Sequence, residues 1–581
     1  LDTDTQLFQA SYVSGVWTGD LVARPVLPSG AVGAVQWRAS QGIPTSGRRV
    51  YTSEGLFPDS LTDEQEVALT RSGSGNYPVT GAQNAAYLAG NRSLEMGSGG
   101  HLRNRNHLLG AIVSSSPAYV KETNTLYVGA NDGMLHAFNA SSGAELFAFI
   151  PSGIDWSQFG DLSRPYYAHR YFVDGPVVVS TREQSGDDRN ILVATLGKGG
   201  KGLFALDVTT PGSFNHSDVE WEEYETDEGN MGLVLGAPVI ANVRTGVGEN
   251  SPVVIVANGI NSSNHRAVLL VYDLLSGDLI KEIDTGAGSE DVPNGLTGAV
   301  GWDSNGDGVV DTVYGGDMLG NVWKFDLSGS PMSWGVDGDP MFVARDSDGK
   351  RQPISARLTV SMHPANFQTW VFFGTGRFMT IDDVSDRSVQ SLYGIRDDGG
   401  DVIVRSDLEG RSTVIVGTRT GADGQVFPVR SFEAHQALPI AKRGWYIDLL
   451  EPPEQDELGE RIISEVQVVN RVLVVASIIP MNDACQSDGR GYLNALDAFT
   501  GTSLAGGSFF DIDGDDDFAD EVIGDDGLPV GSIDLGIGMP TLPNLLRKLA
   551  ATGGSTGETE TVSTMDARFT GRVSWREEVE E

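Results

Sequence analysis

Short segments of alternating apolar and polar residues run through most of this chain, and many end in an Asp or Asn followed by a glycine-containing turn. Alternation places successive side chains on opposite faces of a strand, the Asp or Asn caps the turn, and glycine supplies a positive φ. The pattern therefore predicts repeated β-hairpins. It is clear in five segments and weaker in two, 391–400 and 444–450. The five clear segments are 133–149, 202–212, 268–283, 320–329 and 491–504.

The spacing of these seven hairpins, roughly 50 to 70 residues, fits four-stranded propeller blades better than the shorter repeat of a helical solenoid. We therefore expect an all-β fold, a modified seven-bladed β-propeller with a short N-terminal segment and few short helices. Residues 1–100 are predicted to form a leading segment, in which 17–37 is a hairpin that helps to close the ring. Residues 101–510 would form the propeller, and 511–581 an acidic loop, a linker and a C-terminal strand region that packs on it.

Only two segments have the character of short helices. Residues 60–70 begin with a Ser-x-x-Asp capping pattern, Ser60 to Asp63, and residues 542–551 are rich in leucine and alanine. The tail 551–575 is expected to begin as a flexible linker and to end in a strand.

Charge and composition narrow the function classes. The 581 residues include 40 Lys and Arg against 79 Asp and Glu, a formal charge of −39, which repels phosphate backbones, so nucleic acid is not an expected partner. Cys485 is the sole cysteine, which excludes an intrachain disulfide and a thiolate metal cluster. No apolar run is long enough for a transmembrane segment. The start "LDTDT" carries no initiator Met, and we expect a longer precursor.

One loop has the spacing of a calcium site. In "DSNGDGVVD", residues 303–311, oxygen ligands stand at positions one, three, five, seven and nine, and Gly308 at position six allows the sharp turn. Position twelve is Tyr314 in place of the usual Glu, and the flanks are strand-like, so we predict a Ca²⁺ loop of modest affinity between strands. The alternative is an ordinary polar turn. The predicted ligands are Asp303, Asn305, Asp307, the Val309 carbonyl and Asp311.

Other motifs are weaker. The acidic run 511–520 alternates carboxylates but has Ala519 at position nine, so a second metal site and a solvated acidic loop both remain open. "GKGGKG" (197–202) follows a strand but precedes another one, which favours a glycine-rich hairpin over a phosphate-binding loop. "GGSTG" (553–557) lies outside the strand-turn-helix context of a nucleophile elbow. The eight histidines are scattered and are expected to be satisfied polar residues, and no catalytic residue is predicted.

Several blocks of sequence, taken together in their number and order, carry a further signal. These are "LLGAIVSSSPAYV" (108–120), "YVGANDGMLHAFNASSGAELFAFIPSG" (127–153), "HRYFVDGPVVV" (169–179), "GLFALDVTTPG" (202–212), "GWDSNGDGVVDTVYGGDMLGNVWKFDLSG" (301–329), "VFFGTGRFMTIDD" (371–383), "QSLYGI" (390–395) and "GRVSWRE" (571–577). They resemble one family, the PilC/PilY type IV pilus tip-associated proteins, in their C-terminal β-propeller module, and the similarity extends over roughly residues 100–581.

The resemblance implies a propeller at the cell surface or pilus tip, outer-membrane associated or extracellular. It implies roles in pilus biogenesis, in calcium-dependent control of extension against retraction, in twitching motility and in adhesion to host or abiotic surfaces. It also implies minor pilins as partners, and the five loop positions named above match the family's calcium positions. Ala111 and Ser114 depart from the family's usual Asp and His, and no Arg-Gly-Asp triplet occurs, so functions tied to those residues are not expected.

Two other classes compete with this interpretation. A quinoprotein dehydrogenase shares the repeated turn, but the turn after Asn139 contains no docking Trp, and the lone Cys485 excludes an adjacent-cysteine disulfide. A calcium-stabilised structural adhesin of the integrin-like repeat type would carry several equivalent loops, whereas the sequence has one well-formed loop. We therefore expect a non-enzymatic protein.

Overall fold

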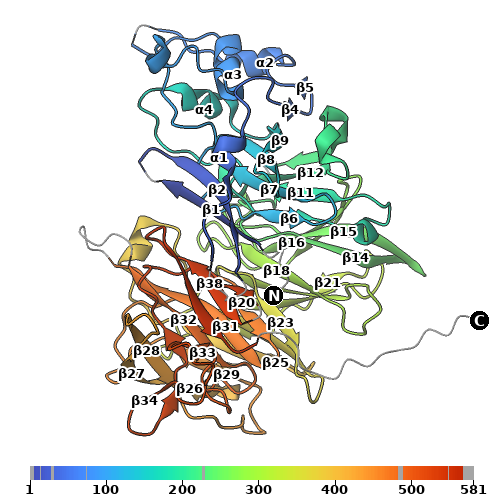
Figure 1. Cartoon of the computed structure of the whole chain (residues 1–581). Helices are drawn as coiled ribbons and strands as arrows, with labels where there is room; N and C mark the ends of the chain where they lie inside the picture. The colour runs from blue at the N-terminus through green and yellow to red at the C-terminus, as the bar shows by residue number, and fades with distance from the viewer. Residues whose placement is uncertain are drawn as a thin grey trace, which may run out of the picture. The chain divides into compact units, whose positions relative to one another are not determined.

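The computed structural model describes residues 6–13, 15–27, 32–73, 75–225, 229–481, 489–546 and 548–566 (Figure 1). Cys485 and the predicted strand at the end of the tail lie outside these residues. In the described part of the chain, helices are short and few beside the many strands. The α-helices are α1 (Ala39–Gly42), α2 (Asp63–Leu69), α3 (Gly81–Ala89), α4 (Trp156–Gly160) and α5 (Arg182–Ser185). Single 3₁₀ turns are η1 (Met96–Ser98), η2 (Asp161–Ser163), η3 (Gly197–Gly199), η4 (Pro211–Ser213), η5 (His216–Asp218), η6 (Ile381–Val384) and η7 (Arg405–Asp407).

The chain divides into two compact units, and the first comprises Asp2–Val343 with Pro353–Leu358. It contains five sheets, whose strands are mostly neighbours in sequence and antiparallel. In order along each sheet they are β1 (Gln6–Val13), β2 (Thr18–Pro25), β3 (Trp37–Arg38); β5 (Gly55–Leu56), β4 (Val50–Thr52), β9 (Glu145–Phe149), β8 (Met134–Asn139), β7 (Thr125–Ala130), β6 (Ala118–Val120); β10 (Val177–Val179), β11 (Ile191–Thr195), β12 (Gly202–Asp207), β13 (Val219–Tyr224); β14 (Val239–Gly246), β15 (Glu249–Ala257), β16 (Val268–Asp273), β17 (Leu279–Asp284); and β18 (Leu296–Trp302), β19 (Thr312–Asp317), β20 (Asn321–Asp326), β21 (Gly335–Val336), with β22 (Phe342–Val343) also on β20.

The second unit comprises Leu1, Ala344–Gln352 and Thr359–Glu581. Its described residues form three sheets of four or more strands and one two-stranded hairpin. These are β23 (Thr359–Met362), β24 (Thr369–Gly374), β25 (Ser391–Asp397), β29 (Gly444–Asp448), β26 (Glu409–Arg411); β27 (Thr413–Thr420), β28 (Val426–Phe432), β36 (Ser532–Ile533), β32 (Arg490–Asp497), β31 (Val472–Ile479), β30 (Gln467–Val469); β33 (Phe510–Asp511), β39 (Thr559–Thr564), β38 (Leu549–Gly553), β37 (Asn544–Leu546); and the hairpin β34 (Val522–Ile523), β35 (Leu528–Pro529).

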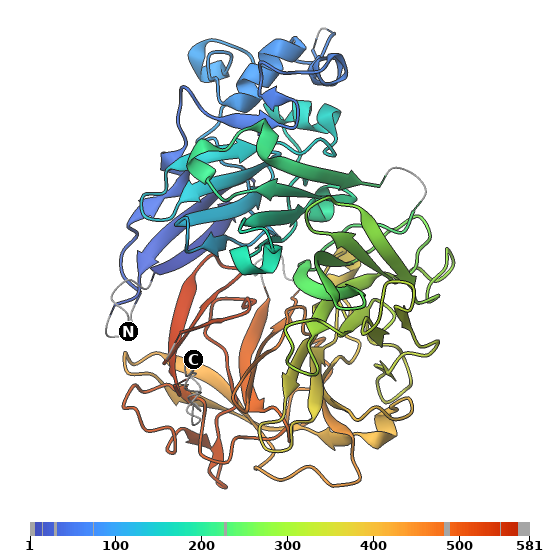
Figure 2. The same ribbon diagram turned by 90° about the vertical axis from the view of Figure 1, so that its right-hand side faces the viewer.

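Within the first unit, successive sheets lie side by side, as the blue-to-green ribbon of Figure 2 shows. Strand β10 contacts β6 and β7 of the sheet before it and β14 of the sheet after it, and β18 contacts β14 and β15. Helices α2, α3 and α4 contact one another and cap this unit (Figure 1). Burial of both faces explains why the middle strands are almost continuously apolar.

The all-β propeller prediction is confirmed, but the number of blades is wrong. Eight sheets of three or more strands are present in the described residues, five in the first unit and three in the second. Counting the repeated turns gave the wrong number of blades because segments 391–400 and 444–450 belong to paired strands of one sheet. Two further sheets, β1-β2-β3 and β33-β39-β38-β37, carry no such turn and were not counted.

One of the two predicted helices is confirmed. Helix α2 lies inside 60–70, but its cap is Thr62, whose side chain accepts from the Gln65 amide while the Gln65 side chain accepts from the Thr62 amide. The second prediction, 542–551, is wrong, since this segment forms the hairpin β37-β38. Pairing with β39 buries Leu549, Ala550 and Ala551, and this tertiary contact overrides their helix propensity.

The predicted hairpin 17–37 corresponds to β2 and β3, which pair antiparallel through Val22 with Arg38 and Ala23 with Trp37. Strand β1 adds to the other edge of β2. Closure of the ring by this segment stays a prediction.

Three tryptophans tie neighbouring sheets together through the repeated turn. Each indole N–H donates to a carbonyl of the turn in another sheet, and each ring packs on that turn's glycine, whose φ is about 70°. A Cβ on any of these glycines would stand within 2.6 Å of the ring. The tryptophan that docks on each turn therefore does not stand inside the turn but comes from a strand earlier in the chain. The sets are Trp37 with Ala140 and Gly143, Trp221 with Leu274 and Gly277, and Trp445 with Ala498 and Gly501.

Candidate functional site

The predicted calcium loop, residues 303–311, joins the antiparallel strands β18 and β19. As the flanking sequence predicted, no helix borders it. Gly306 and Gly308 have φ values of 78° and 82°, so both of the loop's glycines occupy the left-handed region that other residues rarely adopt. The Val309 side chain is buried and anchors the loop, and the Val310 amide donates to the Asn242 carbonyl on β14.

Asp303 organises the loop. One of its carboxylate oxygens accepts the amides of Asn305, Gly306 and Asp307, and the other accepts the Gly308 amide at 2.7 Å. Slight burial acts to raise the pKa of Asp303, but these four backbone donors outweigh it and lower that pKa. The carboxylate is therefore held in its charged form by the same glycine-containing turn that shapes the loop.

The remaining side chains also accept bonds within the loop. Asn305 Oδ1 accepts the Asp307 amide at 2.9 Å, Asp307 Oδ1 accepts the Val309 amide at 3.0 Å, and Asp311 accepts the Ser304 hydroxyl at 2.6 Å. Arg244 on β14 lies 3.3 Å from Asp307 and is the one cation paired with these carboxylates among the described contacts.

This donor set fits a hard cation such as Ca²⁺, because three carboxylates, an amide oxygen and a carbonyl supply oxygen ligands alone. Each carboxylate retains lone pairs beyond the amide bonds it accepts. The three carboxylates do not, however, form one of the described groups whose ligand atoms all lie within 4.8 Å of one another.

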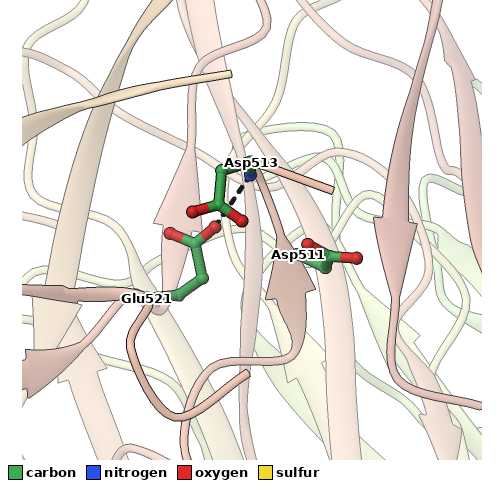
Figure 3. A group of neighbouring side chains, drawn as sticks. All are labelled: Asp511, Asp513 and Glu521. Atoms are coloured by element: carbon green, nitrogen blue, oxygen red, sulfur yellow. Dashed lines mark hydrogen bonds between the residues drawn. The ribbon is translucent and has the colours of Figure 1, made fainter. Parts of the chain in front are cut away.

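The structure instead brings carboxylates together in the acidic run that the sequence left undecided. Asp511, Asp513 and Glu521 place ligand oxygens within 4.8 Å of one another (Figure 3). Glu521 is fully buried: one oxygen accepts the amides of Ile512 and Asp513, and the other accepts from Arg419 Nε at 2.8 Å. A second group, Asp513 with Asp515 and Asp520, overlaps the first.

Sequence reasoning missed Glu521, because the comparison with a nine-position calcium loop ended at Ala519. The available signal was a Glu placed directly before the strand residues Val522 and Ile523, where a side chain can turn back under the loop. Desolvation and the neighbouring carboxylates, chiefly Asp515 and Asp513, raise the pKa of Asp520. Cation binding by this loop stays a prediction beside the alternative of a solvated acidic loop.

The remaining motifs are structural. "GKGGKG" begins as the 3₁₀ turn η3 after β11 and ends at the first residue of β12, and "GGSTG" runs from the last residue of β38 into the turn before β39. His136 is fully buried between two carboxylates, with Nε2 3.1 Å from Asp132 and Nδ1 2.9 Å from Glu145. None of the helices in the described residues has the length and apolar character needed to cross a membrane.

Sheets of sequential antiparallel strands, tied by indoles to a repeated turn and carrying an oxygen-rich loop, define this chain as a β-propeller protein. A family model described as the PilY1 beta-propeller domain matches residues 109–428. The chain belongs to this family.

Relatives and solved structures agree. A type IV pilus biogenesis factor PilY1 homolog of Xylella fastidiosa is 33% identical over 99% of this chain and 47% of its own length. PilY1 of Pseudomonas aeruginosa strain PAK is 30% identical over 85% of this chain and 46% of its length. The crystal structure of the P. aeruginosa PilY1 C-terminal domain matches with a TM-score of 0.61 and 28% identity, covering 76% of this chain and 92% of that one. The chain thus spans about half the length of these curated relatives.

Proposed function

We propose that this chain is the calcium-binding propeller of a type IV pilus tip-associated protein. In this role it supports pilus biogenesis, calcium-dependent control of extension against retraction, twitching motility and surface adhesion, at the pilus tip or cell surface. Minor pilins of the tip would be its partners. The names of the relatives support the pilus role, and the loop 303–311 supports the calcium dependence.

The observation that carries the calcium proposal is the organisation of the loop by Asp303. Four amides fix this carboxylate, while Asp307 and Asp311 add two further carboxylates within nine residues. Such closely spaced charges repel one another, and one Arg244 contact at 3.3 Å on a half-exposed surface offsets little of that repulsion. A bound cation supplies the missing positive charge.

Neighbouring residues couple the repulsion between these carboxylates to the order of the loop. The buried Val309 side chain anchors the loop, the Val310 amide ties it to β14 of another sheet, and the Asp311 amide donates to the Trp302 carbonyl at the end of β18. Neutralised carboxylates leave these anchors undisturbed, whereas repelling ones loosen the junction of β18 and β19. Binding only to the ordered state stabilises it by about 2.7 kcal/mol at a hundredfold excess over Kd.

Isothermal titration with Ca²⁺ tests the site. We expect Asp303→Ala and Asp311→Ala each to lower the affinity at least tenfold, and Asp339→Ala, a change of an exposed Asp of the same unit outside the loop, to leave it unchanged. Unaltered affinity in both loop variants would overturn the assignment. Adding Glu521→Gln to Asp303→Ala measures any ion held by the second acidic loop.

A pull-down against purified minor pilins tests the partner. Capture of pilins by the chain in Ca²⁺, weakened by chelator and by Asp303→Ala, is the expected result. A structural adhesin unrelated to the pilus tip would bind Ca²⁺ and capture no pilin. This outcome would retain the metal site and reject the pilus role.

A further inference from the structure

The carboxylate oxygens of the loop 303–311 differ in what they bond to. Both oxygens of Asp303 and both of Asp311 accept hydrogen bonds from donors within the loop, and Asp307 Oδ1 accepts a loop amide as well. Among the described contacts, Asp307 Oδ2 is the one oxygen of these three carboxylates with no donor from the loop, and Arg244 Nη2 lies 3.3 Å from it. This oxygen is therefore held by a cation from outside the loop.

Arg244 holds that oxygen weakly. A distance of 3.3 Å is long for a hydrogen bond between charged groups, and the contact is single where a guanidinium can form two. Both side chains are 39% exposed, and no other hydrogen bond or ion pair of Arg244 is present in the described residues. An exposed pair of this kind contributes little to stability, so the guanidinium can leave at small cost.

The backbone of β14 keeps Arg244 beside the loop without depending on this ion pair. The carbonyl of Asn242, two residues earlier on the strand, accepts the Val310 amide at 2.8 Å. The register of β14 against β15 shifts between Arg244 and Gly246, and such bulges redirect the neighbouring side chain. The strand thus supplies an uncharged tie to the loop and a cationic side chain that can withdraw while the tie remains.

A guanidinium and a divalent cation compete for the same oxygen. Three carboxylates within nine residues attract positive charge, but two cations close to one carboxylate repel each other. A metal ion that uses Asp307 Oδ2 as a ligand must therefore displace Arg244. The free energy of the ion pair is then subtracted from the free energy of metal binding.

We propose that Arg244 is a built-in competitor of Ca²⁺ in this loop. Its guanidinium pairs with Asp307 Oδ2 while the loop holds no metal ion and leaves that oxygen when Ca²⁺ binds, so the strength of this pair sets how much Ca²⁺ the loop requires. The inference rests on the calcium binding proposed above, and it goes further by naming a residue outside the loop that regulates the affinity.

Isothermal titration of the full 581-residue chain with CaCl₂ tests the competition. We expect Arg244→Gln to bind Ca²⁺ about three- to tenfold more tightly than the parent, because both the ion pair and the repulsion are removed. Arg244→Lys keeps the charge and should bind Ca²⁺ more weakly than Arg244→Gln. Arg266→Gln is the matched control, since it removes the same charge from an exposed pair outside the loop, Arg266 with Asp284 at 2.7 Å, and it should leave the affinity unchanged.

Thermal unfolding separates competition from a purely structural role. In chelator, Arg244→Gln should unfold at a lower temperature than the parent, because the carboxylates of the loop lose their one paired cation. In excess Ca²⁺ the variant should be at least as stable as the parent, since tighter binding stabilises it more. An arginine with a structural role alone would lower the unfolding temperature equally in both conditions.

The outcomes distinguish this inference from the proposed function. Equal affinity of the parent and Arg244→Gln, the same gain in Arg266→Gln, or equal destabilisation of Arg244→Gln with and without Ca²⁺ would each overturn the inference and leave the calcium loop standing. A parent chain that binds no Ca²⁺ would overturn the calcium site itself and this inference with it.

Discussion

The indole of Trp445 covers Gly501 so closely that a Cβ on this glycine would stand 2.5 Å from the ring. Gly501 has a φ of 70°, and the Trp445 N–H donates to the Ala498 carbonyl at 2.8 Å in the same turn. One contact thus joins β29 to the turn that follows β32. The glycine of the repeated turn therefore serves two purposes, since it permits the backbone conformation and makes room for the indole.

Replacing Gly501 with Ala is expected to lower the free energy of unfolding by about 2–4 kcal/mol, because positive-φ strain adds to the clash with Trp445. Gly424→Ala is the matched control: its φ is 84°, with no atom within 4 Å of the added Cβ, so about 1 kcal/mol is expected. Urea unfolding measures both. Equal losses would mean that the indole contact contributes nothing.

Removing Ca²⁺ should lower the thermal unfolding temperature of the unaltered chain. The stabilisation lost is about 2.7 kcal/mol when free Ca²⁺ exceeds Kd a hundredfold. In Asp303→Ala and Asp311→Ala the effect of chelator should fall to about 1.4 kcal/mol or less, because a site weakened tenfold retains only a tenfold excess of free Ca²⁺ over Kd. An undiminished chelator effect in both variants would assign the calcium dependence to other residues.

The buried cluster around His136 makes stability depend on pH. Burial lowers the pKa of His136, but Asp132 and Glu145 outweigh it and raise this pKa to about 9, above its unfolded value of 6.5. The protonated ring therefore stabilises the fold fully below pH 6.5, and the contribution is lost as pH rises towards 9. Up to about 3 kcal/mol is involved.

Glu145 in the same cluster contributes to stability with the opposite dependence on pH. Burial raises the pKa of Glu145, but Arg48 and His136 lower it to about 2, so its contribution is present above pH 4.5 and lost as pH falls towards 2.

Urea unfolding of the parent and of His136→Gln from pH 6 to pH 9 measures the contribution of His136. The parent should lose more stability than the variant over this range; parallel curves would contradict the assignment.

A buried ion pair in the second unit provides another test. Arg430 donates to both oxygens of Glu460 at 2.7 and 2.8 Å, and both side chains are 2% exposed. Arg430→Met should cost about 3–5 kcal/mol, because it leaves the Glu460 carboxylate buried without its cation. The double change Arg430→Met with Glu460→Leu should recover most of this loss in urea unfolding. If it recovers none, the cost does not come from the unpaired charge.

The sequence predicted the class of fold because period-two alternation and turn chemistry are local signals. The blade count required knowing which strands share a sheet, and 391–397 and 444–448 pair across a long insertion that local patterns do not reveal. The helix prediction at 542–551 failed for the same reason, since pairing with β39 decides its conformation.

The residues of the candidate sites likewise fall into two groups, those that the sequence predicted and those that only the fold brings together. The loop 303–311 is contiguous, so the spacing of its carboxylates and the positions of its glycines were visible in the sequence, and both glycines have a positive φ; calcium binding by this loop stays a prediction. Glu521 joins Asp511 and Asp513 only after the chain has turned back, and Trp37 meets Gly143 from more than a hundred residues away. Contacts of that kind depend on the assembled sheets.

The indole contacts also determine how the protein would unfold under mechanical force. The bonds from Trp221 to Leu274 and from Trp445 to Ala498 each span 53 residues of chain. Rupture of one such bond and of the strands it encloses frees a segment that extends to roughly 180 Å at about 3.4 Å per residue. If its ends were pulled apart, the chain would lengthen in discrete steps of that size, and each step would absorb work before the next sheet bears tension.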